Sequence, residues 1–435
     1  MVMKDDEVRR PAPAVLHRAR WLLTGRGFPV EDGAVLVEGE TIRAAGTFKD
    51  VRAFLPARGG VRDHGDAALV AGLVNAHTHL DWSVLRGDLV FPLEGFRAWL
   101  EEILAVRGTF SPEEHRRAAE ASVAEMHGTG TAVFADMTND PALSWRCGRR
   151  GCGVPHRRLF VEVLGFDRWR LEDVPVLDAL GIGDEEGPGM EPISLAAHSP
   201  YAVSPELIVS AKAWCRRLGR PFSIHVAEHP EEVEFVRDGT GFCREVLQRL
   251  GRWVETWRPP GATPVAYLDQ LGVLDERTLL VHAVHVTAED TERIRRRGAA
   301  VCFCPRSNHH MGVGRPNIAR FIEAGVPTAL GTDSLASNTD LNLFREAAFV
   351  LDHWPEMDPA VVLQMATVGG AGVLGVQASR GSLESGKRAE FTAIPLPPAI
   401  SPREVVEAVI REGQEGRCQW IVGSAEGCGS EGSAS

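Results

Sequence analysis

The apolar positions of this chain gather in short runs, and four of these runs end in side chains that commonly bind metals. The four runs end in His77 with His79, then His225, His282 and Asp333. Apolar, partly β-branched runs of about four to eight residues are typical of strands buried on both faces. Because residues i and i+2 of a strand point to the same side, we expect His77 and His79 to share one face at the end of their strand.

Helix-like stretches alternate with these apolar runs through the middle of the chain. They cover residues 112–127, 205–218, 288–297 and 342–352. Alternation of strand and helix over roughly 300 residues is typical of a parallel (β/α)8 barrel, which needs about 250 residues before insertions. Reacting groups in such barrels lie at the C-terminal ends of the strands. All four runs place their polar residues at such an end.

The two ends of the chain have a different pattern. Short β-like runs separated by turn signals lie at residues 14–23, 34–38, 41–45 and 67–73. They predict a small β domain. Near the other end, residues 402–411 are expected to form a short helix and residues 419–422 a last strand. Residues 424–435 are rich in glycine and serine, and we expect them to be frayed.

Composition excludes some classes of partner and location. The chain has 435 residues and a formal charge of −12 with mixed signs, which argues against nucleic acid because phosphate binding needs a basic face. No apolar run approaches the length of a membrane span, and residues 1–10 lack the apolar core of a secretory signal. We therefore expect a cytoplasmic protein without a membrane partner. The eight cysteines are irregularly spaced and expected to be free thiols, with an accessory metal or redox pair of Cys147 and Cys152 as a minor alternative.

Several short motifs are spread over nearly the whole chain. They occupy residues 72–80, 85–87, 198–201, 225–228, 282–285, 304–308, 330–333 and 336–338. In combination they resemble the amidohydrolase superfamily, and within it the metal-dependent deaminases and chlorohydrolases that act on nucleobases and related heterocycles. The resemblance implies an α/β fold in which a (β/α)8 TIM barrel carries a small β-sandwich.

Residues 381–391 are similar to the returning strands with which this family completes the sandwich from the far side of the barrel. The resemblance thus implies a composite β-sandwich domain built from residues 1–68 and 380–435. It also implies that residues 69–379 form the metal-dependent hydrolase barrel.

A metal site also follows from the resemblance. It implies one divalent metal ion held by His77, His79, His225 and Asp333, with an open position for water. Binuclear members of the superfamily bridge two ions with a carboxylated lysine on the fourth strand, but the run at 193–197 has no lysine nearby. Zinc is preferred and ferrous iron stays open, because histidine and carboxylate ligands serve both. The plainer alternative for Asp333, a cap of the following turn, is weakened by its position after a strand.

Three residues are expected to carry the proton transfers. Glu228 lies three residues after His225, and its expected role is to take the proton of the water and pass it to a ring nitrogen. His282 is expected to hydrogen-bond the attacking hydroxide, while Asp333 accepts and relays a proton as ammonia departs. The alternatives are a solvated Glu228 within the acidic run 228–234 and a His282 packed in the core.

The resemblance places further residues against the substrate. They are His198, Trp99, Arg86, Arg306, Ser307 and Asn308. The segment 96–99 would cover the pocket, although its aromatic residues also fit plain packing. A substrate carboxylate, such as the benzoate of aminodeoxyfutalosine, would need a cationic partner. The sequence does not choose among the available arginines, which are Arg86, Arg97, Arg306 and Arg315.

The activity implied is hydrolytic deamination of an aminated purine nucleoside, with release of ammonia. The segments 79–87, 227–235 and 305–310 are most similar to aminodeoxyfutalosine deaminases of the menaquinone route. Asp81 stands where we expect a glutamate, which leaves room for S-adenosylhomocysteine or methylthioadenosine deaminases and for guanine deaminases.

Other classes of protein stay open to different degrees. A chlorohydrolase would use the same metal water against a carbon–chlorine bond. A binding protein without activity would be expected to have lost ligands, and all four candidate ligands are present. A homodimer is an alternative to a monomer that the residues do not decide.

Overall fold

The computed structural model describes residues 14–106, 108–147, 154–179 and 192–422. Three sequence expectations therefore lie outside the described residues: the N-terminal segment 1–10, the tail 424–435 and the pairing of Cys147 with Cys152. Cys147 itself is buried at the end of helix α4 (Pro141–Cys147). Across the described ranges, no helix is long and apolar enough to cross a membrane.

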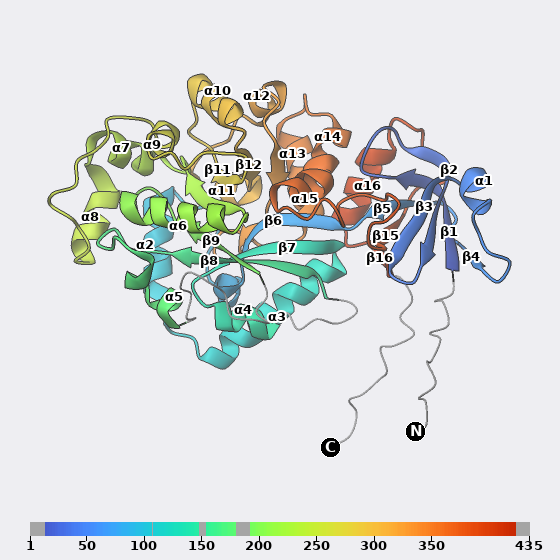
Figure 1. Cartoon of the computed structure of the whole chain (residues 1–435), viewed down its shortest axis with the longest axis horizontal. Coiled ribbons are helices and arrows are strands. Elements are labelled where there is room, and N and C mark those ends of the chain that lie inside the picture. The colour runs from blue at the N-terminus through green and yellow to red at the C-terminus, as the bar shows by residue number, and fades with distance from the viewer. Residues whose placement is uncertain (1–13, 107, 148–153, 180–191, 423–435) are drawn as a thin grey trace, which may run out of the picture.

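The larger sheet has nine strands within the described residues, in the order β13-β12-β11-β10-β9-β8-β7-β6-β14 (Figure 1). In chain order the strands are β6 (Leu73–His79), β7 (Thr131–Thr138), β8 (His156–Val163), β9 (Ile193–Ala197), β10 (Phe222–Val226), β11 (Thr278–His282), β12 (Ala300–Phe303), β13 (Thr328–Leu330) and β14 (Asp333–Ser334). Neighbouring strands are all parallel. Their carboxyl ends therefore meet at one rim of the sheet.

Residues 328–334 close this sheet into a barrel. Strand β13 pairs with β12, and after two residues the same stretch continues as β14, which pairs with β6 by placing Asp333 opposite Thr78. The chain thereby returns to its first barrel strand. The predicted (β/α)8 barrel is confirmed.

Gly331 lies at a tight point of this closure. A Cβ atom added there would lie 2.7 Å from Cβ of His77 and 2.9 Å from Sγ of Cys302. We expect Gly331→Ala to lower the free energy of unfolding by about 1–3 kcal/mol, because overpacking forces its neighbours apart. Denaturant unfolding measures the loss, with Gly128→Ala as control, since a Cβ at Gly128 meets nothing within 4 Å. Equal stability of the two variants would show that the closure has room to yield.

Helices flank the barrel strands in Figure 1. In chain order they are α2 (Phe96–Val106), α3 (Pro112–Gly128), α4, α5 (Pro175–Ala179), α6 (Pro205–Arg217), α7 (Pro230–Asp238), α8 (Gly241–Arg249), α9 (Pro264–Gln270), α10 (Ala288–Arg297), α11 (Pro305–Met311), α12 (Ile318–Glu323), α13 (Leu343–His353), α14 (Pro359–Gln364), α15 (Gly370–Val373) and α16 (Val405–Gln414), with 3-10 turns η1 (Leu80–Leu85) and η2 (Leu171–Asp173) and a π-helical turn η3 (Met365–Gly369). The four predicted helices correspond to α3, α6, α10 and α13 to within a residue. Helices α3 and α6 begin at proline after a serine cap, a common N-terminal signal.

Segments from both termini build the second sheet, at the right of Figure 1. Its strands are β1 (Ala14–Leu23), β2 (Val30–Glu38), β3 (Thr41–Thr47), β4 (Gly60–Asp63), β5 (Ala67–Ala71), β15 (Glu390–Pro395) and β16 (Gln419–Val422), with helix α1 (Phe48–Arg52) after β3. The sheet divides at β1, which pairs with β2 throughout, with β4 at its start and with β5 at its end. The composite origin expected from the resemblance is therefore observed.

Two sequence expectations at the edges of this sheet need adjustment. The expected strand 67–73 is divided, because Gly72 bonds to Glu390 of β15 whereas Leu73 bonds to Gly130 just before β7. The expected helix 402–411 is α16, which begins three residues later, after a turn closed by Ser401 and Glu404. The boundaries 1–68, 69–379 and 380–435 stay a proposal, and β5 carries the terminal sheet to Ala71.

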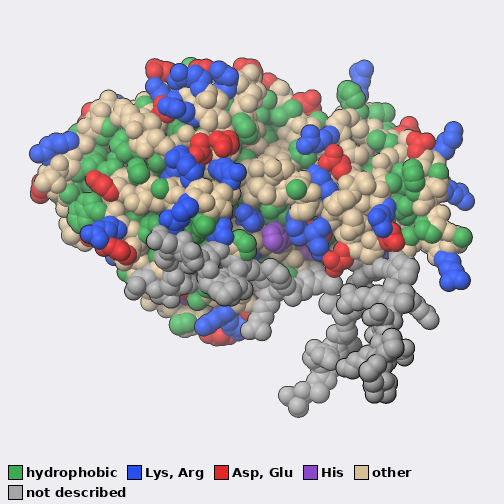
Figure 2. All heavy atoms as spheres, in the orientation of Figure 1, with side chains coloured by type: hydrophobic (Ala, Val, Ile, Leu, Met, Phe, Trp, Pro, Cys, Tyr) green, Lys and Arg blue, Asp and Glu red, His purple; other side chains and the backbone are tan. Residues whose placement is uncertain are grey.

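The surface has charges of both signs. On the face seen in Figure 2, basic and acidic side chains are interspersed over the described part of the molecule. Many of them pair locally along helices, as Arg116 does with Glu113 and Glu120 on α3. Exposed pairs of this kind contribute little to stability, because solvent screens the charges.

Candidate metal and catalytic site

Three histidine rings converge at the C-terminal ends of β6 and β10. The Nε2 atoms of His77 and His79 are 3.2 Å apart, and Nε2 of His225 lies 3.2 Å from the first and 3.3 Å from the second. All three side chains are buried. The i, i+2 spacing along β6 turns both of its histidines toward this common point.

The protonation of the cluster leaves nitrogen lone pairs facing one another. Nδ1 of His225 donates to the carbonyl oxygen of His198 at 2.6 Å, so Nε2 of the neutral ring carries no proton. Burial lowers the pKa of His79 to about 4 and that of His225 well below its usual value, so both rings are neutral at pH 7. Imidazole nitrogens gathered this closely fit a shared divalent cation, which removes the repulsion between lone pairs.

Asp333 adds a carboxylate to the cluster. Its Oδ1 atom lies 3.5 Å from Nε2 of His77 and 3.8 Å from Nε2 of His79. Its Oδ2 atom accepts hydrogen bonds from the hydroxyls of Ser307 at 2.6 Å and Ser337 at 2.8 Å. Burial alone would raise the pKa of Asp333, but the hydrogen bond with His77 and the other imidazoles hold it well below the usual range. The carboxylate therefore faces the three rings in its ionised form.

Left-handed backbone conformations gather at this rim. Among the described residues, five that are not glycine have positive φ, and four of them lie here: Ala227 at 50°, His282 at 73°, Ala283 at 48° and Asp333 at 59°. Each such conformation costs roughly 1–3 kcal/mol and persists only where the surrounding structure imposes it. The strand ends bend in this way where β10, β11 and the closing strand present their polar side chains.

His282 links the cluster to Glu228. Its Nε2 atom lies 3.3 Å from Oε1 of Glu228 and 4.0 Å from Oδ2 of Asp333. The amide of Asn308 donates to Nδ1 of His282 at 3.0 Å, which leaves the ring proton on Nε2. Burial lowers the pKa of His282 to about 3, so the neutral ring can donate from Nε2 toward the carboxylates.

Glu228 is buried beside other carboxylates. Burial raises its pKa well above the usual value, and the charges of Asp333 and Glu232 raise it further. The backbone amides of Ala227 and Glu228 donate to Glu232 at 2.8 and 3.0 Å, so this second glutamate braces the turn after β10. The acidic run 228–234 is thus not uniformly solvated, because Glu228 and Glu232 are both buried.

His198 stands next to the cluster on a support that the sequence analysis missed. Its Nδ1 atom lies 2.8 Å from Oε1 of Glu162, a buried residue on β8. The amide of Asn139 donates to Oε2 of Glu162 at 2.8 Å. Burial would raise the pKa of Glu162, but His198 holds it below the usual range. A charged residue inside a buried strand was the signal that could have identified Glu162.

Three further candidate residues have hydrogen-bond partners in the structure. Ser307 and Asn308 lie in the site, where they hydrogen-bond to Asp333 and His282. Trp99 donates from its indole nitrogen to the carbonyl of Ala336 at 2.8 Å.

The candidate arginines have acidic or aromatic partners of their own. Arg306 is buried, with a bidentate pair to Asp340 at 2.8 and 3.0 Å. Arg86 pairs with Glu125, Arg97 with Glu245, and Arg315 lies over Trp354. Their contact with substrate stays a prediction.

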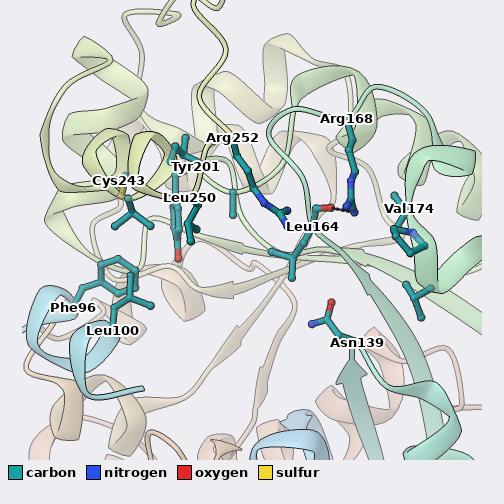
Figure 3. Close-up of a pocket in the computed structure, with 15 residues that line it drawn as sticks. Phe96, Leu100, Asn139, Leu164, Arg168, Val174, Tyr201, Cys243, Leu250 and Arg252 are labelled. Atoms are coloured by element: carbon teal, nitrogen blue, oxygen red, sulfur yellow. Dashed lines mark hydrogen bonds between the residues drawn. The ribbon is translucent and has the colours of Figure 1, made fainter. Parts of the chain in front are cut away.

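A pocket of about 400 Å³ (Figure 3) lies beside His198, next to the histidine cluster. Asn139 and Tyr201 belong to its lining, and the Tyr201 ring lies 6.0 Å from the ring of His198. Most of the wall is apolar and includes Phe96 and Leu100 from α2. Cavities of about 300–1,000 Å³ with mostly apolar walls and a few polar groups are typical of small-molecule sites.

Comparison with known proteins gives consistent matches. Residues 68–416 match the amidohydrolase family. The chain is 34% identical over 389 residues to aminodeoxyfutalosine deaminase of Deinococcus radiodurans, covering 81% of this chain and 84% of that protein. It is 31% identical over 361 residues to 5-methylthioadenosine/S-adenosylhomocysteine deaminase of Moorella thermoacetica, covering 80% and 78%. A zinc-bound adenosine deaminase structure from Xanthomonas campestris superimposes with a TM-score of 0.74 at 26% identity, covering 95% and 93%.

Proposed function

Because this chain belongs to the amidohydrolase family, we propose that it is a metal-dependent hydrolytic deaminase of an aminated purine nucleoside, with aminodeoxyfutalosine as the preferred substrate. The observation that carries the proposal is the convergence of three imidazole Nε2 atoms within 3.3 Å beside Asp333 and Glu228. The deaminase relatives support the choice of reaction. Such a reaction places the protein in the menaquinone route as an enzyme that acts on a carbon–nitrogen bond.

One divalent ion fits the donor set. His77, His79, His225 and Asp333 would hold it, because their ligand atoms already face one point. When bound, the ion would supply the nucleophile by lowering the pKa of a water molecule towards about 7. Zinc is our proposal, supported by the zinc-bound relative, and ferrous iron is the alternative. The strand before His198 offers no lysine to bridge a second ion.

Glu228 is proposed as the group that moves the proton. As a carboxylate it takes a proton from the attacking water, and its raised pKa lets it hold that proton until a ring nitrogen accepts it. Protonation of the ring nitrogen makes the neighbouring C–NH2 carbon a better electrophile. The short link from Glu228 to His282 keeps the carboxylate turned toward the metal ligands.

His282 and Asp333 are proposed to guide attack and departure. With its proton on Nε2, His282 can donate a hydrogen bond to the attacking oxygen and fix its direction. Asp333 has one oxygen held by two serine hydroxyls and the other directed at the histidines, so it can accept a proton and pass it to the leaving amine. Ammonia then leaves from the tetrahedral carbon.

The substrate is tested by ammonia release from a panel of aminodeoxyfutalosine, S-adenosylhomocysteine, methylthioadenosine, adenosine and guanine. We expect the highest kcat/KM with aminodeoxyfutalosine, by at least about tenfold, a factor that corresponds to about 1.4 kcal/mol. A higher value with S-adenosylhomocysteine or methylthioadenosine would favour the second candidate function, which the Moorella relative supports. No ammonia from any member would contradict the deaminase proposal and favour a chlorohydrolase, tested with a chlorinated triazine.

Asp81, the residue that departs from the expected glutamate, is turned toward β7. Its Oδ2 atom accepts from the backbone amide of Asn139 at 3.2 Å and lies 3.3 Å from the hydroxyl of Thr138. It therefore supports the loop that carries Asn139 into the pocket.

A cytoplasmic location and a homodimer stay predictions.

A further inference from the structure

The pocket beside the metal ligands has two charged residues in its lining. Of the described residues around it, Arg168 and Arg252 alone carry a charge. Figure 3 shows both side chains running down from the upper part of the view, with Asn139 below them. Since Asn139 bonds to Glu162 and Glu162 bonds to His198, the Asn139 end of the pocket is the end nearest the metal ligands. In Figure 3 the two guanidinium groups lie above Leu164 and Asn139 lies below it, so we assign the arginines to the other end.

Arg168 is held by the backbone around it. Gly165 has φ of 141°, and a Cβ atom there would lie 2.6 Å from Cδ of Arg168, so glycine lets the arginine stem cross this loop. The hydroxyl of Ser204 donates to the carbonyl of Arg168, and Gly165 pairs with Ala202 and Ser204 through backbone bonds of 3.1 Å. The guanidinium also donates to the carbonyl of Leu164 at 3.3 Å. The loop after β8 thus fixes the arginine at the pocket.

Neither guanidinium pairs with an acidic side chain among the described residues. Arg168 has only its bond to a carbonyl oxygen, and Arg252 is anchored through its backbone amide to Leu247 at 2.8 Å. A guanidinium has five N–H donors and matches a carboxylate in a bidentate pair. Both groups therefore keep donors for a ligand, in contrast to the buried Arg306, which is paired with Asp340.

We infer that Arg168 and Arg252 form the anion-binding end of the substrate pocket and select nucleosides whose sugar carries an apolar arm ending in a carboxylate. The apolar residues of the lining, among them Phe96 and Leu164, suit an aromatic or aliphatic arm. This inference rests on the proposed deaminase function, because it assigns the specificity of that same site. Arg168 and Arg252 thus replace the earlier candidates for binding a substrate carboxylate, which were Arg86, Arg97, Arg306 and Arg315.

The test compares substrates with and without a carboxylate. Arg168→Met and Arg252→Met are assayed for kcat/KM with aminodeoxyfutalosine, S-adenosylhomocysteine and neutral methylthioadenosine. For each variant we expect the ratio of kcat/KM between aminodeoxyfutalosine and methylthioadenosine to fall by about 10- to 100-fold, carried mainly by KM, because a charge-assisted hydrogen bond is lost from binding. The S-adenosylhomocysteine arm shows whether an amino-acid carboxylate is read in the same way as a benzoate.

Arg170→Met is the matched control, because Arg170 follows Arg168 by two residues but is exposed and pairs with Glu172. It should keep the wild-type ratio. Arg168→Lys keeps the charge and the stem but not the bidentate geometry, so we expect a ratio between those of the wild type and Arg168→Met. This variant keeps the inference testable if the methionine variant misfolds. An unchanged ratio in the arginine variants, or equal losses with charged and neutral substrates, overturns the inference. Absence of ammonia release by the wild-type enzyme overturns the proposed function instead.

Discussion

Glu228→Gln is expected to lower kcat by about 1,000-fold while the protein keeps its metal. General acid–base catalysis contributes about 100- to 10,000-fold, and glutamine can neither take a proton from water nor give one to a ring nitrogen. The amide preserves the size of the side chain and can still lie near His282, which is 3.3 Å from the carboxylate. Steady-state ammonia release gives kcat, and elemental analysis of the same sample gives the metal content.

The control for this variant is Glu234→Gln on helix α7, which begins two residues after Glu228. Glu234 hydrogen-bonds to Thr240 and lies outside the pocket and the metal ligands. Its kcat should match the wild type. A Glu228→Gln enzyme that retains kcat within about tenfold, with metal bound, would remove Glu228 from proton transfer, since acid–base catalysis contributes at least about 100-fold.

His225→Ala should abolish turnover by removing the metal. One of the three converging nitrogens is lost, and metal affinity should fall by more than about 100-fold, because even groups that only orient a ligand are worth about 10- to 100-fold. We expect about one ion per chain in the wild type, in keeping with a mononuclear hydrolytic site. Elemental analysis of purified protein and ammonia release before and after chelation measure both effects.

His127→Gln is the control, since this histidine lies on α3 and stacks on Trp420 of the terminal sheet. It should retain metal and activity. Restoration of activity by added zinc after chelation of the wild type would support the ion assignment. Two ions per chain would contradict the single-metal proposal, and full activity in metal-free protein would contradict the site.

The barrel and the convergence of the four runs could be anticipated from local patterns. Residues 73–79 alternate in a way that sends His77 and His79 to one face, and a parallel barrel brings the ends of distant strands together. The order of runs along the chain therefore held enough information to place His225, His282 and Asp333 near them. The structure brings these residues within 4 Å of their neighbours in the site.

Other parts of the site depend on contacts that no local pattern reveals. Glu232 sits in an acidic run that looks solvated, yet it is buried because it accepts the amides of the turn after β10. The local sequence does not distinguish Arg168 from other loop arginines. Its position at the pocket depends on contacts with Gly165 and Ser204. Arg306 belongs to a recognisable motif, but its salt bridge to Asp340 spans 34 residues and appears only in the fold.

The strand that closes the barrel also carries the fourth candidate ligand, Asp333. Mechanical opening of the barrel at this seam would separate Asp333 from His77 and His79, because strand β14 is held to β6 through this same short ladder. A circularly permuted chain with new ends between β13 and β14 would therefore be expected to forfeit cation binding together with its architecture. New ends in an exposed helix connection, such as the turn around Gly251, would leave the seam covalently continuous.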